Sequence, residues 1–238
     1  MNTFDLSIIH FLNEFSQRSQ TFDVLVALIT KTDLFRGGVI AALFLWAWVK
    51  SGNESEERRG YLLFGMIASV FSVLLARGLA LSLPYRIRPL RSPSLNFHIP
   101  FGTNPDALVG WSSFPSDHAT LFVCLSTAIW FASKRLGAIA FCWTSLFILV
   151  PRIYLGIHYP TDILAGALLG LGIACLSKIT WLRKGVTKTG MCWLQAHPAS
   201  FYTLLFLCWF EIIESFTSLR DLLGFSLLSV HTALNSLH

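Results

Sequence analysis

Long blocks of apolar residues, separated by short polar stretches, dominate this chain. We interpret five or six of them as membrane-spanning helices, because each approaches the length of about 17–25 residues that crosses a bilayer. The predicted spans are residues 35–50, 60–82, 117–134, 136–153, 160–180 and 199–219. The first is short and the last contains Glu211 and Glu214, so these two depart most from an ideal span.

The first 34 residues differ from these spans. Residues 4–17 place apolar side chains at the spacing of an amphipathic helix that lies along a membrane interface. Residues 22–30 are apolar but too short to cross. Asp5 and Glu14 interrupt the apolar run and no basic segment precedes it, so we expect no cleaved signal peptide. We therefore predict an all-α, polytopic membrane helical bundle of about six transmembrane helices with interfacial N-terminal helices.

We expect the chain to form a single membrane domain over residues 1–238. It divides into interfacial helices at 1–34, a transmembrane core at 35–219 and a C-terminal tail at 220–238. Internal repeats, low-complexity segments and an appended soluble domain are not visible in the sequence.

Composition supports the membrane class before any motif is considered. Hydrophobic residues make up 54% of the 238 positions and charged residues 13%, whereas a soluble domain carries about a quarter charged residues. Mean hydropathy is +0.60. The net charge of +5 arises from short loops between spans and from one polar connection, so we predict no nucleic-acid partner. The five cysteines are scattered through mostly apolar stretches, which argues against a disulfide framework or a zinc site.

Basic residues in the short loops predict the orientation of the chain. Nine of them fall on one side of the six spans, which the positive-inside rule makes cytoplasmic. They are Lys50, Arg58, Arg59, Lys134, Arg135, Lys178, Arg183, Lys184 and Lys188. Residues 83–116 and 152–160 then share the non-cytoplasmic face. That face also carries four arginines, Arg86, Arg88, Arg91 and Arg152. They are an exception to the positive-inside rule, and a functional role would explain it. We predict a multi-pass integral membrane protein, located in a bacterial cytoplasmic membrane.

Polar residues suited to phosphate chemistry gather at the ends of the predicted spans. In the segment Pro115-Ser116-Asp117-His118, proline ends a loop and Ser116 or Asp117 is a good N-cap. His118 then stands in the first turn of a helix, where unpaired N–H groups and the helix dipole favour an anion. Taken alone, the segment also fits a simple capping sequence with an incidental histidine.

A second group surrounds the start of the fifth span. Pro160 is well placed as the first residue of that span, so Asp162 in the first turn can reach back to His158 just before it. A carboxylate on one ring nitrogen presents the other nitrogen as a nucleophile. Arg152 closes the preceding span at the same face, and arginine beside apolar sequence indicates function. An interfacial salt bridge between Arg152 and Asp162 is the alternative.

The connection 83–116 adds a third element on the same face. Its six prolines exclude regular helix, and long irregular loops in compact proteins commonly bind ligands. It contains Arg86 and Arg88. An arginine guanidinium group can form bidentate hydrogen bonds with phosphate oxygens. On its own, this loop is also typical of a headgroup-binding surface. Together with two histidines, the arginines predict a phosphoryl site for a lipid-linked phosphate.

Three segments, Arg88-Pro89, Pro115-Ser116-Asp117-His118 and Arg152-x5-His158-x3-Asp162, resemble the signatures of the type 2 phosphatidic acid phosphatase superfamily. That superfamily includes membrane lipid phosphatases, undecaprenyl pyrophosphate phosphatases, soluble acid phosphatases and vanadium haloperoxidases. The resemblance covers roughly residues 75–170 by motif, and the arrangement of spans extends it over most of the chain. A haloperoxidase is disfavoured, because those relatives are soluble and this chain is not.

The resemblance implies a role for each matched residue. His158 is expected to be the nucleophile that forms a phosphohistidine, Asp162 to orient it, and His118 to protonate the leaving oxygen. The residues expected to hold the phosphate are Arg88, Arg152 and Ser116. No metal and no other cofactor is implied, since guanidinium groups and helix N-termini supply the positive charge.

Three positions depart from the family pattern. Asp117 stands where the family has glycine, and an acidic residue there either repels phosphate or binds a nearby histidine or arginine. Pro151 replaces the serine that usually precedes the arginine. Leu81 occupies the position of an expected lysine, for which Arg77 or Arg86 can substitute, with a slight preference for Arg77. Asp117, Arg77 and Arg86 are therefore included among the candidate phosphate-site residues.

The residues and the resemblance together predict a membrane lipid phosphate or pyrophosphate phosphatase that acts without metal through a phosphohistidine. Undecaprenyl pyrophosphate or a phosphatidic-acid-like lipid is the leading substrate, and membrane lipids are the other expected partners. Two alternatives stay open: a phosphotransferase that moves a phosphoryl group between lipids, and a non-catalytic lipid-binding membrane protein of the same fold. The intact histidines and Asp162 favour an enzyme, whereas Asp117 and the absent lysine favour the non-catalytic alternative.

Overall fold

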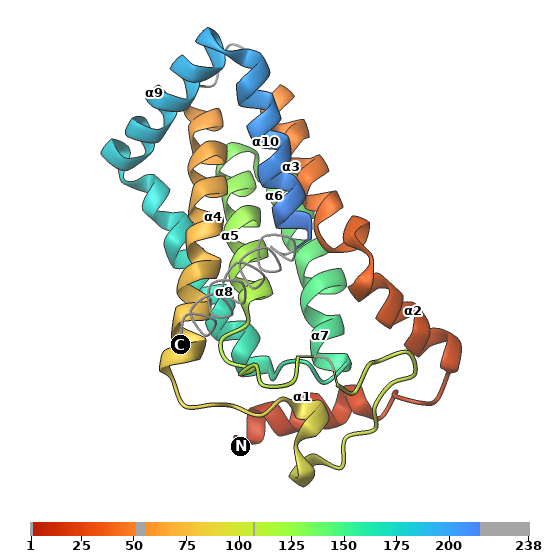
Figure 1. The fold of residues 1–238 in the computed structure, drawn as a ribbon. Helices are drawn as coiled ribbons and strands as arrows, with labels where there is room; N and C mark the ends of the chain where they lie inside the picture. The colour runs from red at the N-terminus through yellow and green to blue at the C-terminus, as the bar shows by residue number, and fades with distance from the viewer. Residues whose placement is uncertain (1, 51–55, 107, 215–238) are drawn as a thin grey trace, which may run out of the picture.

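The computed structural model describes residues 2–50, 56–106 and 108–214, and every regular element in these ranges is helical (Figure 1). The α-helices there are α1 (Thr3–Asn13), α2 (Gln20–Lys31), α3 (Val39–Lys50), α4 (Glu56–Ser82), α5 (Asp117–Ala132), α6 (Lys134–Trp143), α7 (Val150–Tyr154), α8 (Pro160–Cys175), α9 (Thr180–Ala196) and α10 (Pro198–Ile213). The shorter turns are the π-helical η1 (Leu34–Gly38) and η5 (Thr144–Leu149) and the 3₁₀ turns η3 (Pro89–Arg91), η4 (Pro93–Leu95) and η6 (Leu176–Lys178). The predicted all-α fold class is confirmed.

The bundle is built around α5, which packs against α3, α4, α6 and α8. Its side chains are buried almost throughout, and Phe122, Leu125 and Ile129 are fully buried in the main hydrophobic cluster. Helix α8 approaches α5 closely through Gly166 and Gly170. A Cβ at either glycine would collide with a backbone carbonyl oxygen of α5 or its N-cap, so the absence of a side chain sets the distance between these two helices.

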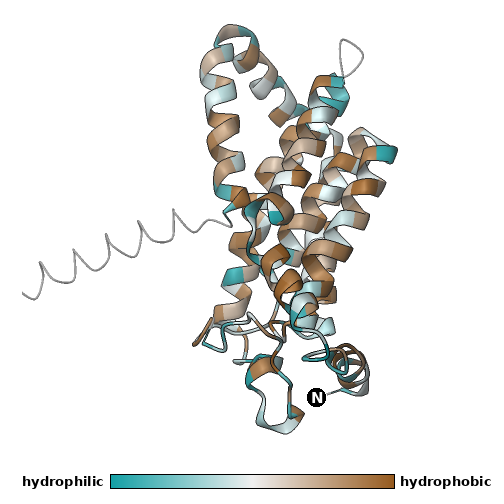
Figure 2. Cartoon of the chain, turned by 90° about the vertical axis from the view of Figure 1, so that its right-hand side faces the viewer, coloured by the Kyte–Doolittle hydropathy of each residue, from teal (hydrophilic) through white to brown (hydrophobic). Residues whose placement is uncertain are grey.

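Three of the described helical runs are long and apolar enough to cross a membrane: Glu56–Ser82, Lys134–Tyr154 and Pro160–Lys178. Helices α5 and α10 are apolar but shorter. Hydrophobic residues cover much of the length of the bundle, while hydrophilic residues gather toward helix ends and connections (Figure 2). These features agree with the helical membrane bundle that the sequence predicts.

Helix α9 is an element that the sequence reasoning missed, because its lysines and arginines were assigned to a polar connection. Arg183 on this helix is buried and pairs with Glu57 at 2.8 Å. Its guanidinium also lies 4.2 Å from the centre of the Tyr61 ring. Burial of one charged residue against α4 thus lets a hydrophilic segment pack as a helix.

The last predicted span, residues 199–219, coincides with α10 over the part that the structure describes. Residues 215–238, which include the predicted C-terminal tail, lie outside the described residues.

Helix α1 lies across one end of the bundle, where it contacts α7 and α8 (Figure 1). Its buried face is mixed in character and consists of Asp5, Ile9 and Asn13. The aromatic side chains of this helix point away from the bundle, and Phe11 is 60% exposed. Interfacial placement of α1 stays a prediction, and an outward aromatic face supports it.

The two motif-bearing connections meet at this same end of the bundle. Helix α4 ends there and α5 begins there, so residues 83–116 cross that end. Helix α7 also ends there and α8 begins there, with residues 155–159 between them. Helix direction alone therefore brings the predicted site residues into one region.

Candidate active site

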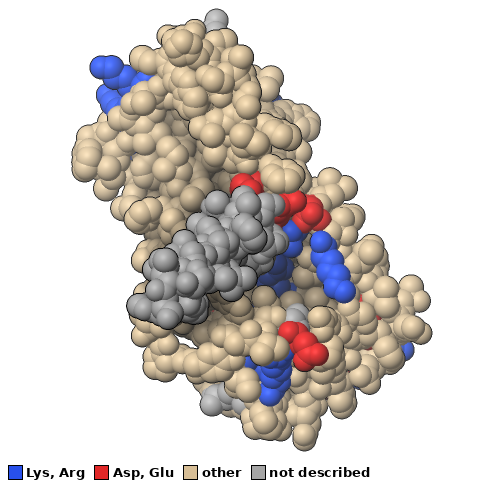
Figure 3. Space-filling view, in the orientation of Figure 1, with Lys and Arg blue, Asp and Glu red and all other residues tan. Residues whose placement is uncertain are grey.

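A cavity of about 600 Å³ opens at this end of the bundle. Six of the nine predicted site residues line it: Arg77, Arg88, Asp117, His118, Arg152 and His158. The other three, Arg86, Ser116 and Asp162, are not among its lining residues. In the space-filling view, Lys and Arg side chains gather in a hollow bordered by Asp and Glu side chains (Figure 3).

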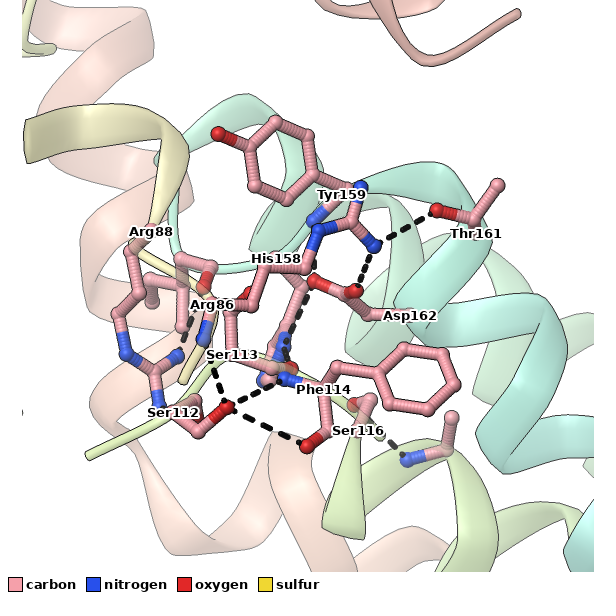
Figure 4. A network of polar contacts seen from close by, with 12 residues as sticks. Arg86, Arg88, Ser112, Ser113, Phe114, Ser116, His158, Tyr159, Thr161 and Asp162 are labelled. Atoms are coloured by element: carbon pink, nitrogen blue, oxygen red, sulfur yellow. Dashed lines mark hydrogen bonds and ion pairs between the residues drawn. The ribbon is translucent and has the colours of Figure 1, made fainter. Parts of the chain in front are cut away.

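His158 lies just before α8, and only 3% of its surface is exposed. Its Nδ1 lies 2.8 Å from the carbonyl oxygen of Ser113 (Figure 4). A carbonyl oxygen only accepts hydrogen bonds, so Nδ1 carries the proton and Nε2 keeps a lone pair. The ring is thus held in the tautomer that a nucleophile at Nε2 needs. Sequence reasoning missed the Ser113 contact, because a backbone carbonyl has no side-chain signature.

Asp162 is fully buried beside His158, but its closest contacts are with other groups. One carboxylate oxygen accepts from the Tyr159 backbone N–H at 2.8 Å, and the other pairs with Arg86 (Figure 4). Its distance to His158 Nδ1 is 3.8 Å, which is too long for a hydrogen bond. Asp162 therefore acts on the imidazole as a nearby charge, while Ser113 makes the direct contact.

Burial lowers the pKa of His158 from its ordinary value, because a charged imidazolium is poorly solvated inside the protein. Asp162 and Asp117 oppose this shift, and Arg88 adds to it. The neutral, nucleophilic form of the ring is consequently present at more acidic pH than for an exposed histidine.

The turn between α7 and α8 depends on Gly156. Its φ of +68° belongs to the left-handed region that glycine tolerates best. A Cβ there would also lie 2.7 Å from the Phe97 ring and 2.8 Å from Leu90 Cβ. The Gly156 carbonyl accepts from the Leu90 backbone N–H at 3.0 Å. This contact joins the arginine-bearing connection to the loop that carries His158.

Arg88 links the same two segments with its guanidinium. Nη1 donates to the Ile157 carbonyl at 2.7 Å and Nη2 donates to the Ser112 carbonyl at 3.2 Å. Burial lowers the pKa of Arg88, which Asp117 and Asp162 partly counteract. Arginine retains its charge in proteins, so Arg88 places a fixed positive charge at the cavity wall.

Arg152 adds a second buried positive charge from α7, with 4% of its surface exposed. Its one described hydrogen bond runs from Nη1 to the Ile148 carbonyl of the preceding turn at 3.3 Å. Asp162 pairs with Arg86 in the described part of the chain, so the alternative of an Arg152–Asp162 salt bridge is not what the structure contains. Arg152 also lines the cavity, so its guanidinium adds positive charge to the wall.

His118 and Asp117, at the start of α5, form a second imidazole–carboxylate pair in the cavity wall. His118 Nδ1 lies 2.8 Å from Asp117 Oδ1, and Arg77 Nη2 lies 3.7 Å from Asp117 Oδ2. Of the two readings of Asp117, the structure favours binding to a nearby histidine and arginine. Asp117 thereby also draws Arg77 to the cavity, where the family pattern expects a lysine.

Ser116 and Arg86 occupy positions that differ from the expectation of phosphate contacts. Ser116 is fully buried as the N-cap of α5, and its hydroxyl accepts from the Ala119 N–H at 3.4 Å. Arg86 lies outside the cavity lining and pairs with both Asp5 and Asp162. Both residues therefore organise the ends of α5 and α8 rather than reach the cavity.

Two basic residues in the cavity wall were absent from the sequence reasoning, Lys31 of α2 and Arg36 of η1. Lys31 donates to the Gly102 carbonyl at 2.9 Å. Arg36 pairs with Asp33 and donates to the Ile213 carbonyl at 3.2 Å. The signal for Arg36 was its position at the start of an apolar run, where a positive charge is costly.

Comparison with known proteins gives likenesses over most of the chain. A profile of the PAP2 superfamily matches residues 58–185. Lipid A 1-diphosphate synthase of Escherichia coli strain K12 is 30% identical over 170 residues, which is 69% of this chain and 70% of that protein. The putative undecaprenyl-diphosphatase YbjG of the same organism is 26% identical, over 78% of this chain and 86% of that protein.

A shorter likeness concerns the bacitracin transport permease protein BcrC of Bacillus licheniformis. It is 44% identical over 62 residues, and the match spans 25% of this chain and 29% of that protein. Among solved structures, LpxE of Aquifex aeolicus superposes with a TM-score of 0.52 at 22% identity, over 75% of this chain and 99% of that one. That likeness supports the fold. With the apolar helices, these likenesses identify an integral membrane protein.

Proposed function

This chain belongs to the PAP2 superfamily, and from that membership and the geometry of its cavity we propose that it is a membrane lipid phosphatase. The observation that carries the proposal is a pair of imidazoles on the wall of one cavity. In each, an acceptor fixes Nδ1: the Ser113 carbonyl for His158 and the Asp117 carboxylate for His118. The Nε2 atom of His158 thereby keeps its lone pair, and Arg88 and Arg152 line the same cavity as both histidines.

In the first step, the His158 Nε2 lone pair attacks phosphorus and a P–N bond forms. The bond between phosphorus and the leaving oxygen breaks, and its electron pair stays on that oxygen. His118, entering as an imidazolium with Asp117 beside it, transfers its Nε2 proton to the leaving oxygen. Arg88 and Arg152 stabilise the charge that develops on the phosphoryl oxygens.

In the second step, water attacks the phosphohistidine. His118, now neutral, removes a proton from the water, the new P–O bond forms and the P–N bond breaks with its electrons returning to His158 Nε2. Inorganic phosphate leaves, and both histidines recover their starting protonation states. Asp162, 3.8 Å from His158 Nδ1, stabilises the positive charge that the ring carries in the intermediate.

We propose a lipid diphosphate such as undecaprenyl pyrophosphate as the preferred substrate, with a phosphatidic-acid-like lipid as the competitor. Beyond the two arginines beside the histidines, Lys31, Arg36 and Arg77 also line the cavity. Five cations around one cavity favour the substrate with more negative charge, and a diphosphate carries more charge and more oxygen acceptors than a monophosphate. The relative named as a putative undecaprenyl-diphosphatase supports the same choice.

A phosphotransferase is the second candidate. The relative at 30% identity is named lipid A 1-diphosphate synthase, a name that indicates formation of a lipid diphosphate. The same phosphohistidine at His158 serves both reactions, because only the acceptor in the second step differs: water in hydrolysis, a lipid phosphate in transfer.

The test uses purified protein in EDTA with a panel of lipid monophosphates, lipid diphosphates and added lipid acceptors. Wild type is expected to release free phosphate fastest from the diphosphates, without loss of rate in EDTA, and the His158→Ala variant is expected to release none. Phosphate that appears only on an added lipid supports the transferase. If neither protein releases or transfers phosphate with any lipid of the panel, an enzymatic function is contradicted.

A further inference from the structure

A buried carboxylate on the N-terminal helix α1 takes part in the structure that holds the His158 loop. Asp5 is fully buried and lies outside residues 58–185, the part of the chain that matches the family profile. It accepts three hydrogen bonds: from the Thr161 backbone N–H at 2.9 Å, from the Thr161 hydroxyl at 2.7 Å and from Arg86 Nη2 at 2.7 Å. Helix α1 is thereby hydrogen-bonded to the first turn of α8.

Arg86 joins this carboxylate to Asp162. Its Nη1 donates to Asp162 and, at 2.9 Å, to the Thr161 hydroxyl (Figure 4), while its Nη2 donates to Asp5. The guanidinium lies 4.1 Å from the centre of the Tyr159 ring, the residue directly after His158. One arginine thus spans two buried carboxylates in a fixed plane.

The charge balance of this cluster follows from its composition. Two carboxylates and one guanidinium leave a net charge of −1. With Arg86 and Asp162 alone, the charge would be zero, and an imidazolium at His158 would face a neutralised pair. Asp5 therefore restores a negative charge next to the ring that becomes positive during phosphoryl transfer.

We infer that Asp5 is a positioning residue for phosphoryl transfer at His158, because it engages Arg86 and leaves Asp162 available as a negative charge to the imidazole. The inference rests on the proposed function. Asp5 acts only through Arg86 and Thr161 and does not line the cavity. The other charged or titratable groups around His158 are Asp162 on α8, Arg88 in the connection, Asp117 and His118 on α5 and Arg152 on α7.

The experiment compares Asp5→Asn, Arg86→Gln and the double variant with wild type. The pKa of His158 is measured by NMR titration of histidine labelled at Cε1, with the resonance assigned through His158→Ala. Loss of the Asp5 charge is expected to lower the His158 pKa by about 0.5 or more, and loss of the Arg86 charge to raise it. The double variant, with the net charge of −1 restored, is expected to return near the wild-type value.

Kinetics give the second readout. For Asp5→Asn, kcat/KM is expected to fall about tenfold, as supporting residues around a reactive group commonly do, and the acidic limb of its pH profile to move to lower pH. The double variant is expected to recover the position of that limb. Because Arg86→Gln moves the pKa in the opposite direction, the sign test survives even if Asp5→Asn does not fold.

Asp23 supplies a matched control for a purely structural role. It is also fully buried, on α2, and holds the Phe101 backbone N–H at 3.0 Å and the Tyr154 hydroxyl. Asp23→Asn is expected to lower thermal stability without moving the His158 pKa. An unmoved His158 pKa in both Asp5→Asn and Arg86→Gln overturns the inference. Failure of the proposed function is a different result, in which wild type releases no phosphate from any lipid.

Discussion

Asp117 stands in the cavity wall where the family resemblance implies a glycine, and its contacts show how the site accommodates a carboxylate. The carboxylate holds His118 Nδ1 at 2.8 Å and faces Arg77 at 3.7 Å. An acidic side chain beside a phosphate site is unfavourable by itself, but here it is paired with an imidazole and a guanidinium. We propose that Asp117 holds the His118 ring in the tautomer and orientation that proton transfer to the leaving oxygen requires.

Substitution of Asp117 by Asn keeps the shape of the side chain and removes its charge. The His118 ring then loses the carboxylate that fixes Nδ1, so kcat/KM is expected to fall about tenfold. The Asp117→Gly variant, which introduces the residue that the family resemblance implies, is expected to change kcat/KM in the same direction. An unchanged kcat/KM in both variants contradicts this role.

The pH dependence of wild type follows from the burial of His158. As the proposed nucleophile, His158 has to be neutral, and burial lowers its pKa below the ordinary value of about 6.5. Activity is therefore expected to persist as the pH falls through 6.5 and to be lost only at lower pH. Measuring kcat/KM between about pH 4 and pH 9 checks this, and an acidic midpoint at or above 6.5 contradicts it.

The residues of this cavity were predictable to the extent that their side chains carry the chemistry. Two histidines and two arginines at span ends, joined by helix direction, gave the grouping of His118, His158, Arg88 and Arg152. The sequence did not reveal the Ser113 contact, because a carbonyl oxygen is present at every position. The placement of Arg86 depended on Asp5 of α1, which no local spacing connects to it.

The turn between α7 and α8 sets the position of His158 through Gly156. The Gly156→Ala variant combines a left-handed φ with close contacts to Phe97 and Leu90. It is expected to destabilise the protein by about 2–4 kcal/mol and to reduce kcat through displacement of the nucleophile. Thermal unfolding in detergent and phosphate release measure the two effects.

Gly172 on α8 is the matched control for this substitution, since a Cβ there meets open space. The Gly172→Ala variant is expected to leave both stability and kcat near their wild-type values. Equal behaviour of the two alanine variants would show that the Gly156 turn is not a determinant of the site.

At the level of helices, the apolar blocks predicted the elements well and the polar segments poorly. A helix coincides with each of the six predicted spans over the described residues, because sustained hydropathy reports membrane helices reliably. Helix α9 was missed, since hydropathy ignores an arginine such as Arg183 that is buried by pairing with Glu57. Pairing across helices is a tertiary property, and a search for apolar length does not detect it.

For the whole molecule, we propose that the cavity opens on the non-cytoplasmic face of the membrane. The helix directions place Lys134 and Lys178 at the opposite end of the bundle from the cavity, where Lys178 lies 4.9 Å and Lys134 5.9 Å from the centre of the Phe131 ring. Basic residues at one end and the reactive connections at the other agree with the positive-inside rule.

Single cysteines introduced into a cysteine-free variant test this orientation. Ser94 lies exposed in the connection 83–116 and Arg135 lies exposed between α5 and α6. In intact cells, a membrane-impermeant maleimide is expected to label Ser94→Cys, and to label Arg135→Cys only after the membrane is opened. The reverse labelling would place the cavity on the cytoplasmic face.

A covalent phosphohistidine is the step on which the proposed hydrolysis depends, and the His118→Ala variant offers a way to trap it. With the monoester 4-nitrophenyl phosphate, the 4-nitrophenolate leaving group needs no proton, so the first step proceeds without His118 while the second step lacks its base. We expect a burst of one 4-nitrophenol per protein and, by mass spectrometry, phosphate on the peptide that contains His158. A burst without phosphate on that peptide, or the same burst in the His118→Ala, His158→Ala double variant, would contradict nucleophilic attack by His158.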